Sequence, residues 1–226
     1  VQLPRKQPSR MTLSLGDGDP LNDGKTSEEM HDSYCIVCMD NIQNKKTLKC
    51  SHSFCSSCID DVFRVKPACP VCNTFYGTYY GTQPRDGVMK VTRIWQALPG
   101  YESSGTIVID YHFPPGIQGP EHQNPGKRYS STSRRAFLPA CEEGERVLQL
   151  LTTAFKRRLI FTIGTSSTTG LSNVITWNDI HHKTNLGGGP AFGYPDPGYL
   201  RRVQEELYLK GVTVAILEHS PMESPV

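Results

Sequence analysis

The feature of this chain that most restricts its fold is a run of cysteines between residues 35 and 72. Seven of the eight cysteines fall there with one histidine, in the order Cys35-x2-Cys38-x11-Cys50-x-His52-x2-Cys55-x2-Cys58-x10-Cys69-x2-Cys72. Zinc takes four sulfur or nitrogen ligands in a tetrahedron, and a Cys-x2-Cys turn supplies two of them. The pattern therefore predicts two closed zinc sites with no position left for a water, so both metals are structural.

A module of this size cannot bury enough apolar surface to fold alone, so the metal is expected to hold it together. No stretch has the pattern of a secretory signal, and no apolar run reaches the length of a membrane span. We therefore expect thiolates in a reducing compartment, the cytoplasm or also the nucleus, and no membrane partner. The remaining cysteine, Cys141, is interpreted as structural, because its acidic neighbours disfavour a nucleophilic thiolate.

The composition divides the chain into four parts. Residues 1–31 are rich in Pro, Gly, Asp and Ser without an apolar period, which predicts a disordered leader. The zinc module occupies 32–78, a mixed α/β domain follows at 79–213, and 214–226 form a tail. The expected fold class is therefore α+β, with a small two-zinc module ahead of a mixed α/β domain.

The second domain shows clear signals for strands and helices. Segments 106–113 (TIVIDYHF) and 159–164 (LIFTIG) are rich in β-branched and aromatic residues, which predicts strands. A helix between them is predicted by apolar residues at helical spacing, namely Val147, Leu150, Leu151, Ala154 and Phe155. In the last helix, Asp196 is predicted as the N-cap, Pro197 as the first helical residue and Gly211 as the stop. The expected buried stripe of that helix consists of Leu200, Val203 and Leu207.

The charges argue against one class of partner. The chain carries 24 basic and 22 acidic residues, for a net charge of +2 at pH 7. Proteins that are driven onto DNA or RNA by phosphate contacts need a far larger basic surplus. A nucleic-acid partner is therefore not expected.

Two polar stretches lie in the second half of the chain. Residues 164–170 (GTSSTTG) follow a predicted strand and offer backbone N–H groups and hydroxyls, which suit an anionic or sugar-rich ligand. An ordinary Ser/Thr turn is the simpler alternative, and the residues alone leave both open. Residues 175–184 read ITWNDIHHKT. If this stretch is extended, Trp177, Asp179 and His181 share one face and the next histidine points to the other, so the adjacent histidines are not a metal pair.

With a histidine as its fourth ligand, the cysteine pattern resembles the RING finger. The resemblance implies a cross-brace with interleaved sites, in which the two zinc ions are bound by Cys35, Cys38, Cys55 and Cys58 and by Cys50, His52, Cys69 and Cys72. It also implies a surface that docks a ubiquitin-conjugating enzyme charged with ubiquitin. Ile36 and Pro70 match the apolar contact positions of that surface. Asn73 stands where many RING ligases carry a cation that holds the donor ubiquitin.

The two polar stretches, together with EHQNPGKRY (121–129) and GYPDPGYL (193–200), resemble the Deltex carboxyl-terminal domain. That domain follows a RING in Deltex ubiquitin ligases. The resemblance covers about residues 33–213 and looks most like the deltex-3 branch. It implies a groove for ADP-ribose or NAD that is lined by Ser167 and His181.

The family resemblance also implies a catalytic role for Glu206 on the last helix, for which the alternative is an i,i+4 ion pair with Arg202. One position departs from the members that pass ubiquitin to a hydroxyl of ADP-ribose. Those members carry a histidine before GYPDP, whereas this chain has Phe192. Phenylalanine can stack on an adenine or nicotinamide ring, but it cannot move a proton. We therefore expect weak ligand binding through Ser167, His181 and Phe192, without efficient transfer to ADP-ribose.

Together these features predict a RING-type ubiquitin-protein ligase with two structural zinc ions. Its expected acceptors are lysines of protein substrates, ADP-ribosylated ones among them, and the family resemblance implies a role in Notch signalling. The alternative is a reader that binds ADP-ribosylated partners while the RING serves as a scaffold. The sequence leaves open whether the chain forms homo- or hetero-oligomers.

Overall fold

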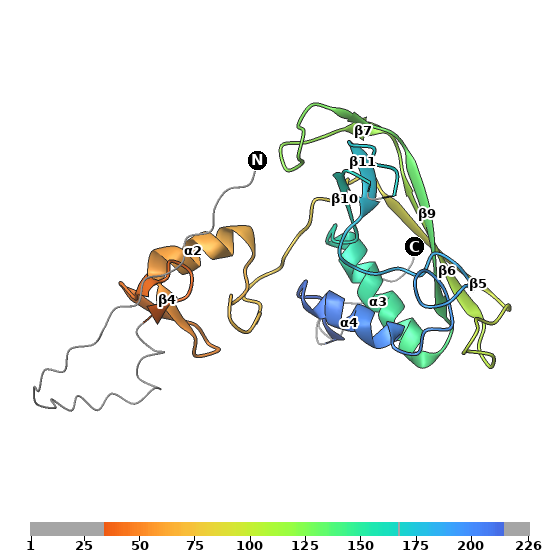
Figure 1. Ribbon diagram of the computed structural model, residues 1–226, viewed down its shortest axis with the longest axis horizontal. Helices are drawn as coiled ribbons and strands as arrows, with labels where there is room; N and C mark the ends of the chain where they lie inside the picture. The colour runs from red at the N-terminus through yellow and green to blue at the C-terminus, as the bar shows by residue number, and fades with distance from the viewer. Residues whose placement is uncertain (1–33, 167, 215–226) are drawn as a thin grey trace, which may run out of the picture.

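The computed structural model describes residues 34–166 and 168–214 and shows a small zinc module beside a larger α/β domain (Figure 1). The predicted leader at 1–31 and residues 215–226 of the predicted tail lie outside these ranges. Among the described helices, none is long and apolar enough to cross a membrane.

The zinc module is built from two short antiparallel hairpins and one helix. β1 (Tyr34–Cys35) pairs with β2 (Asp40–Asn41), and β3 (Lys45–Thr47) pairs with β4 (Ser53–Cys55). Helix α2 (Ser56–Val65) begins directly after β4. The buried apolar cluster of this module consists of Cys35, Leu48, Phe54, Cys55, Ile59 and Cys69. Half of these residues are cysteines, so the apolar core alone is too small to hold the module together.

A three-stranded antiparallel sheet with the order β5-β6-β9 forms the centre of the second domain. β6 (Thr106–Phe113) lies between β5 (Val88–Ile94) and β9 (Thr132–Pro139). The strand predicted at 106–113 is confirmed, and its almost continuous burial matches its central place in the sheet. β5 is an edge strand, and the side chain of Trp95 at its end is fully exposed.

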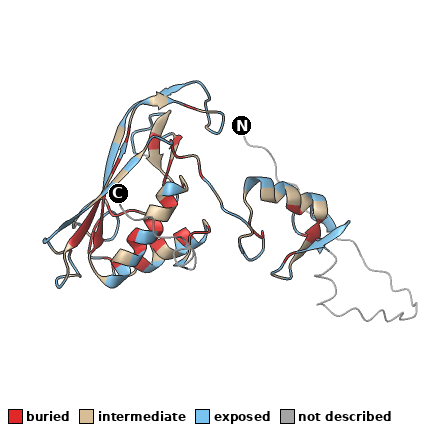
Figure 2. Ribbon diagram, turned by 180° about the vertical axis from the view of Figure 1, so that it is seen from behind, coloured by how far each residue is buried: buried red, intermediate tan, exposed pale blue. Residues whose placement is uncertain are grey.

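One helix packs against this sheet, and a second helix packs against the first. Helix α3 (Glu142–Lys156) contacts β9 and α4 (Tyr199–Tyr208). Its buried residues confirm the helix predicted from the spacing, and they include Val147, Leu150, Leu151 and Ala154, with Phe155 partly buried. Figure 2 shows that the buried residues gather on the strands and on the facing sides of these helices. The core therefore lies between the sheet and the helices.

Two hairpins complete the domain. β7 (Gly116–Ile117) pairs with β8 (Arg128–Tyr129), and β10 (Phe161–Gly164) pairs with β11 (Val174–Trp177). The strand predicted at 159–164 therefore starts at Phe161. The hairpin β10–β11 brackets the serine- and threonine-rich turn and leads directly into the two histidines.

The last helix, α4, buries the predicted stripe of Leu200, Val203 and Leu207. The prediction of its start was wrong, because Gly198 occupies the N-cap position and no side chain caps the helix. Asp196 and Pro197 precede the helix instead. After the helix, Gly211 adopts the left-handed φ of +71° that suits a glycine.

Asp196 does not cap the helix because its carboxylate binds two cations. The Lys183 ammonium is fully buried, and its Nζ lies 2.7 Å from Asp196 Oδ2 and 2.5 Å from the Pro190 carbonyl oxygen. Arg202 Nη2 lies 2.5 Å from the same carboxylate oxygen. The hydrogen bonds from Arg202 and Lys183 lower the pKa of Asp196 to about 2. This ion pair fixes the irregular segment that joins β11 to α4.

Asp196→Asn should destabilise the second domain by about 3–5 kcal/mol at pH 7, because it leaves the buried ammonium of Lys183 without a carboxylate. Since the folded-state pKa of Asp196 lies below its unfolded value, its stabilisation is present above about pH 4 and is lost as the pH falls through about 2. Urea unfolding at several pH values measures both effects. Asp110→Asn is the matched control, because Asp110 pairs with Arg135 on the surface, where such pairs contribute at most about 1 kcal/mol. Equal losses of unfolding free energy for the two variants would contradict the stabilising role assigned to Asp196.

Candidate functional site

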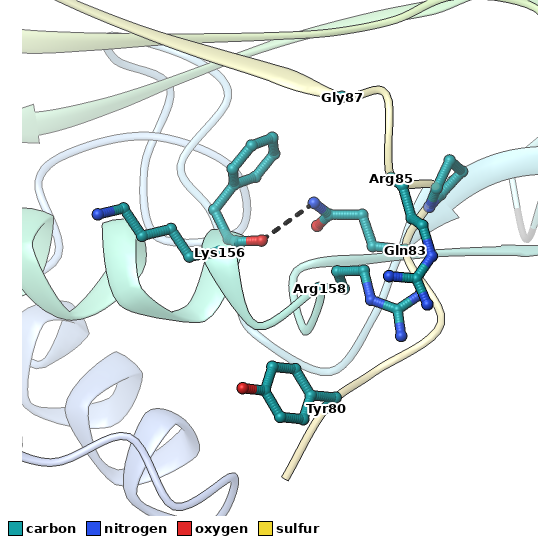
Figure 3. Close-up of a pocket in the computed structure, with 8 residues that line it drawn as sticks. Tyr80, Gln83, Arg85, Gly87, Lys156 and Arg158 are labelled. Carbon is teal, nitrogen blue, oxygen red and sulfur yellow. Dashed lines mark hydrogen bonds between the residues drawn. The ribbon is translucent and has the colours of Figure 1, made fainter. Parts of the chain in front are cut away.

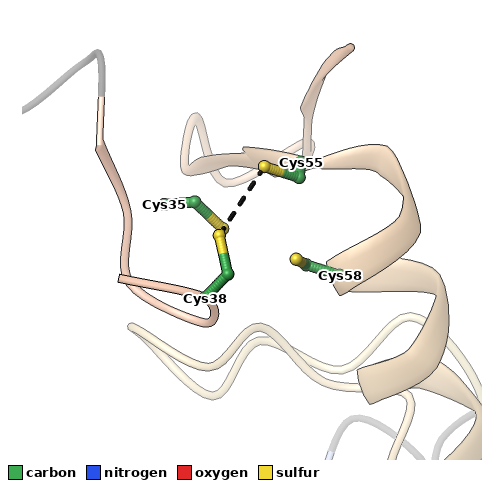
Figure 4. Close-up of side chains that lie close together, drawn as sticks. All are labelled: Cys35, Cys38, Cys55 and Cys58. Carbon is green, nitrogen blue, oxygen red and sulfur yellow. Dashed lines mark hydrogen bonds between the residues drawn. The ribbon is translucent and has the colours of Figure 1, made fainter. Parts of the chain in front are cut away.

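The structure gathers the eight predicted zinc ligands into two clusters, in each of which all ligand atoms lie within 4.8 Å of one another. The clusters are Cys35, Cys38, Cys55 and Cys58 (Figure 4), and Cys50, His52, Cys69 and Cys72. This is the interleaved grouping that the RING resemblance implies. A RING finger with two zinc-binding clusters therefore forms the first module.

The spacing of the ligand atoms fits zinc. The Sγ atoms of Cys38 and Cys55 lie 3.9 Å apart, and His52 Nδ1 lies 3.4 Å from Cys50 Sγ. Tetrahedral zinc with Zn–S bonds of about 2.3 Å separates neighbouring sulfurs by about 3.8 Å, and an S–N pair by slightly less. Bound zinc would supply the positive charge that lets four thiolates share one site.

The apolar residues predicted to dock a conjugating enzyme lie on the surface. Ile36, between the first two ligands, is 49% exposed, and Pro70, between the last two, is exposed as well. Val71 beside Pro70 is also exposed. Asn73 is different, because it is only partly exposed and its Oδ1 accepts a hydrogen bond of 2.7 Å from Lys66 Nζ.

In the second domain, Trp177 stacks between two rings. Its ring centroid lies 4.4 Å from that of Phe161 and 4.4 Å from that of His182. A shared face for Trp177 and His181 was expected only if the stretch is extended, and it is not, because β11 ends at Trp177 and the chain bends after it. Asn178 fixes the turn by donating from its backbone N–H to the Ile160 carbonyl oxygen.

His182 is a structural histidine. It is buried, and its Nδ1 lies 2.9 Å from the Ile180 carbonyl oxygen while its Nε2 lies 3.0 Å from the Tyr111 hydroxyl. Because a carbonyl only accepts, Nδ1 donates and Nε2 accepts from Tyr111, which is the neutral form of the ring. Burial lowers the pKa of His182 to about 4, in agreement with that form.

His181 and Glu206 meet through the main chain of His181. Glu206 Oε2 accepts a hydrogen bond of 2.6 Å from the His181 backbone N–H, and the Tyr199 hydroxyl donates to the His181 carbonyl oxygen at 3.0 Å. Burial and then the charge of Lys183 lower the pKa of the His181 ring, so the ring is neutral at pH 7. The alternative partner of Glu206, Arg202, binds Asp196 instead.

Phe192 presents its ring to solvent and is 64% exposed. Its carbonyl oxygen accepts hydrogen bonds from the backbone N–H groups of Thr184 and Asn185 at 2.9 and 3.0 Å, which ties its loop to the segment after His181. An exposed ring on a tied loop is suited to stacking on a planar ligand.

Ser167 lies outside the described residues, and the contacts that can be described lie further along the hairpin. Asn173, which has a φ of +60°, accepts hydrogen bonds at its Oδ1 from Gln118 Nε2 at 2.8 Å and Asn124 Nδ2 at 3.0 Å. Asn124 of the EHQNPGKRY motif therefore contacts the residue directly before β11, three residues after the serine- and threonine-rich turn.

Sequence reasoning missed the residues that hold this site in place. Tyr111, Tyr199, Lys183 and Asp196 are buried and fix the segment that carries His181. The motifs HHKT (181–184) and GYPDP (193–197) were a usable signal, since a lysine and an aspartate near predicted site residues can form a buried pair.

A cavity of about 570 Å³ lies elsewhere, between the segment before β5 and the carboxyl-terminal end of α3 (Figure 3). It is lined by Tyr80, Gln83, Pro84, Arg85, Gly87, Phe155, Lys156 and Arg158. Gln83 Nε2 donates across it to the Phe155 carbonyl oxygen at 3.3 Å. None of the predicted site residues lines this cavity.

Comparison with known proteins agrees with this arrangement. The profile of the Deltex C-terminal domain matches residues 80–212, which is more than half of the chain. The chain belongs to the Deltex family. The profile of the C3HC4-type zinc finger (RING finger) matches residues 34–72.

The chain is also similar to curated Deltex proteins. It is 60% identical over 82% of its length to the human "Probable E3 ubiquitin-protein ligase DTX3", of which it covers 54%, and this places it in the deltex-3 branch. It is 38% identical over 87% of its length to the E3 ubiquitin-protein ligase DTX4 of Mus musculus, of which it covers 37%. The chain thus spans about half the length of the DTX3 relatives that it matches.

Removal of zinc should unfold the RING finger and leave the Deltex domain folded, because no ligand of either cluster lies beyond Cys72. Chelation followed by limited proteolysis should leave a protected fragment close to residues 80–212. Cys58→Ser should lower the zinc content, whereas Cys141→Ser, outside both clusters, should not. Loss of the protected fragment on chelation would contradict the independence of the two parts.

Proposed function

We propose that this protein is a RING-type ubiquitin-protein ligase that directs ubiquitin to lysines of protein substrates. The observation that carries the proposal is the succession of a two-zinc RING finger, with Ile36 and Pro70 exposed, and a Deltex domain in one chain. Two apolar side chains on the surface of so small a module are well explained by a partner that covers them.

The RING contributes orientation rather than covalent chemistry. The charged conjugating enzyme holds ubiquitin as a thioester, and the substrate lysine amine attacks the thioester carbonyl. The C–S bond breaks, an isopeptide bond forms, and the thiol remains on the conjugating enzyme. A ligase that holds the thioester in a reactive pose accelerates this step by positioning alone.

For the Deltex domain we propose a site for ADP-ribose or NAD formed by Ser167, His181 and Phe192. The neutral ring of His181 can hydrogen-bond to a sugar or phosphate, and the exposed Phe192 ring can stack on a base. Glu206 stands behind His181 and holds its backbone, so it orients the site. Such a site would recruit ADP-ribosylated substrates, and a role in Notch signalling is proposed through the family resemblance.

A reader without ligase activity is the second candidate, since the exposed ring of Phe192 suits binding and cannot transfer protons. One pair of measurements separates the two functions. Autoubiquitylation with a charged conjugating enzyme detects the ligase, and calorimetry with ADP-ribose detects the reader. Binding without autoubiquitylation by any of several conjugating enzymes would favour the reader.

Ile36→Ala should abolish most ubiquitin transfer and leave the fold intact, because it removes apolar docking surface but no zinc ligand. Loss of this burial weakens conjugating-enzyme binding by about 1–2 kcal/mol. The rate of ubiquitin discharge at several conjugating-enzyme concentrations measures the effect. Val88→Ala is the control, as it shortens an exposed aliphatic side chain on β5 in the other domain. Full activity of Ile36→Ala would show that this surface is not used.

Phe192→His should raise transfer of ubiquitin to free ADP-ribose, because a general acid–base group typically contributes about 10²–10⁴-fold to such a step. Mass spectrometry of the products, with ADP-ribose in excess, measures the change. Trp95→His is the control, since it places a histidine at another exposed aromatic position. Efficient transfer to ADP-ribose by the unaltered protein would show that Phe192 does not limit this reaction.

A further inference from the structure

A set of contacts joins the RING finger to the Deltex domain, and neither the zinc clusters nor the His181 site uses it. At its centre is Lys66, the residue that follows α2. Its Nζ donates to Asn73 Oδ1 at 2.7 Å and to the Leu209 carbonyl oxygen at 3.1 Å, and it lies 5.1 Å from the centroid of the Phe75 ring. One ammonium thus connects the zinc module to a residue 143 positions further along the chain.

The Deltex side of this junction is the end of a helix. Leu209 is the C-cap residue of α4, and carbonyl groups at a helix end lack partners within the helix and favour a cation. Phe75 packs against Gly211 so closely that a Cβ there would lie 2.7 Å from the ring. Arg157 Nη1 donates to the Gly211 carbonyl oxygen at 2.9 Å, which fixes this residue from the other side. The junction is therefore closely packed.

The RING side of the junction is Asn73, and its side-chain amide has an unpaired donor. Its φ is +56°, and its Nδ2 is buried without a hydrogen-bond partner in the described part of the chain. A buried donor that makes no hydrogen bond costs about 1–3 kcal/mol. Because Lys66 holds Oδ1, the amide cannot turn its N–H groups outward without breaking that bond. The strain is relieved if the amide swings out and donates to a partner.

We propose that Lys66 is a positioning residue that restrains ubiquitin transfer. It acts by holding the Asn73 amide turned inward. Asn73 stands directly after the last zinc ligand, where the proposed ligase would meet the donor ubiquitin, so the inference rests on the proposed function. Engagement of the charged conjugating enzyme requires Asn73 to leave Lys66. The anchor at Leu209 holds the ammonium in place and so maintains the restraint.

Removal of the ammonium tests the restraint. Lys66→Met keeps a long side chain but releases Asn73, and single-turnover discharge of ubiquitin from a preloaded conjugating enzyme to free lysine should become about tenfold faster, the value of one hydrogen bond to a charged group. The affinity for the conjugating enzyme without ubiquitin should not change, because only the charged form requires Asn73 to leave Lys66. In the Asn73→Ala background, Lys66→Met should have no further effect, because Lys66 acts through Asn73. Lys66→Arg should restore the restraint.

Lys210→Met is the matched control, since Lys210 is a neighbouring cation that binds Asp179 and does not contact Asn73. A second measurement does not depend on activity. The side-chain amide signals of Asn73 in a nitrogen-15 spectrum should be protected from exchange in the unaltered protein and in Lys210→Met, and exposed in Lys66→Met. A discharge rate that is unchanged or reduced in Lys66→Met overturns the proposal. If no variant discharges ubiquitin, the proposed function fails. Unprotected Asn73 signals in the unaltered protein would show that Lys66 does not restrain Asn73, and would overturn the proposal as well.

Discussion

The candidate site in the Deltex domain depends on one buried ammonium. Lys183 has no exposed surface, so its charge requires a carboxylate, and Asp196 supplies it from the other end of an irregular segment. The HHKT motif supplies the cation of this ion pair, and the GYPDP motif supplies its carboxylate. His181, two residues before Lys183, and Phe192, four residues before Asp196, are carried by the segment that the pair holds, which explains how a loop without secondary structure can present a defined surface.

The two modules of the chain are stabilised by different interactions. The RING finger relies on metal because its apolar cluster is small, whereas the Deltex domain has a continuous core between a sheet and two helices. The contacts of Lys66 and Phe75 with the end of α4 join them. Because Glu206 lies one turn earlier on the same helix and accepts a hydrogen bond from the His181 backbone, α4 has contacts with both the segment that carries His181 and the RING.

Zinc ligands, strands and helices were predictable from the sequence wherever no residue far along the chain competed for the same groups. The spacing of the cysteines gave both zinc clusters, and the apolar patterns gave β6 and α3 because each reflects a single buried surface. The N-cap assigned to Asp196 failed because a distant lysine competes for the same carboxylate. The interleaving of the ligands came only through family resemblance, and the contact between Lys66 and Leu209 leaves no local pattern, since 143 positions separate them.

The two tryptophans of the chain occupy opposite environments. Trp95 is fully exposed at the end of β5, whereas Trp177 is stacked between Phe161 and His182. A water-soluble quencher such as iodide reaches the first indole far more readily than the second, so the fluorescence that remains reports on Trp177. That indole stacks on the residue next to His181. Occupation of the neighbouring site would therefore be visible in the intrinsic emission of the native chain, without an attached dye.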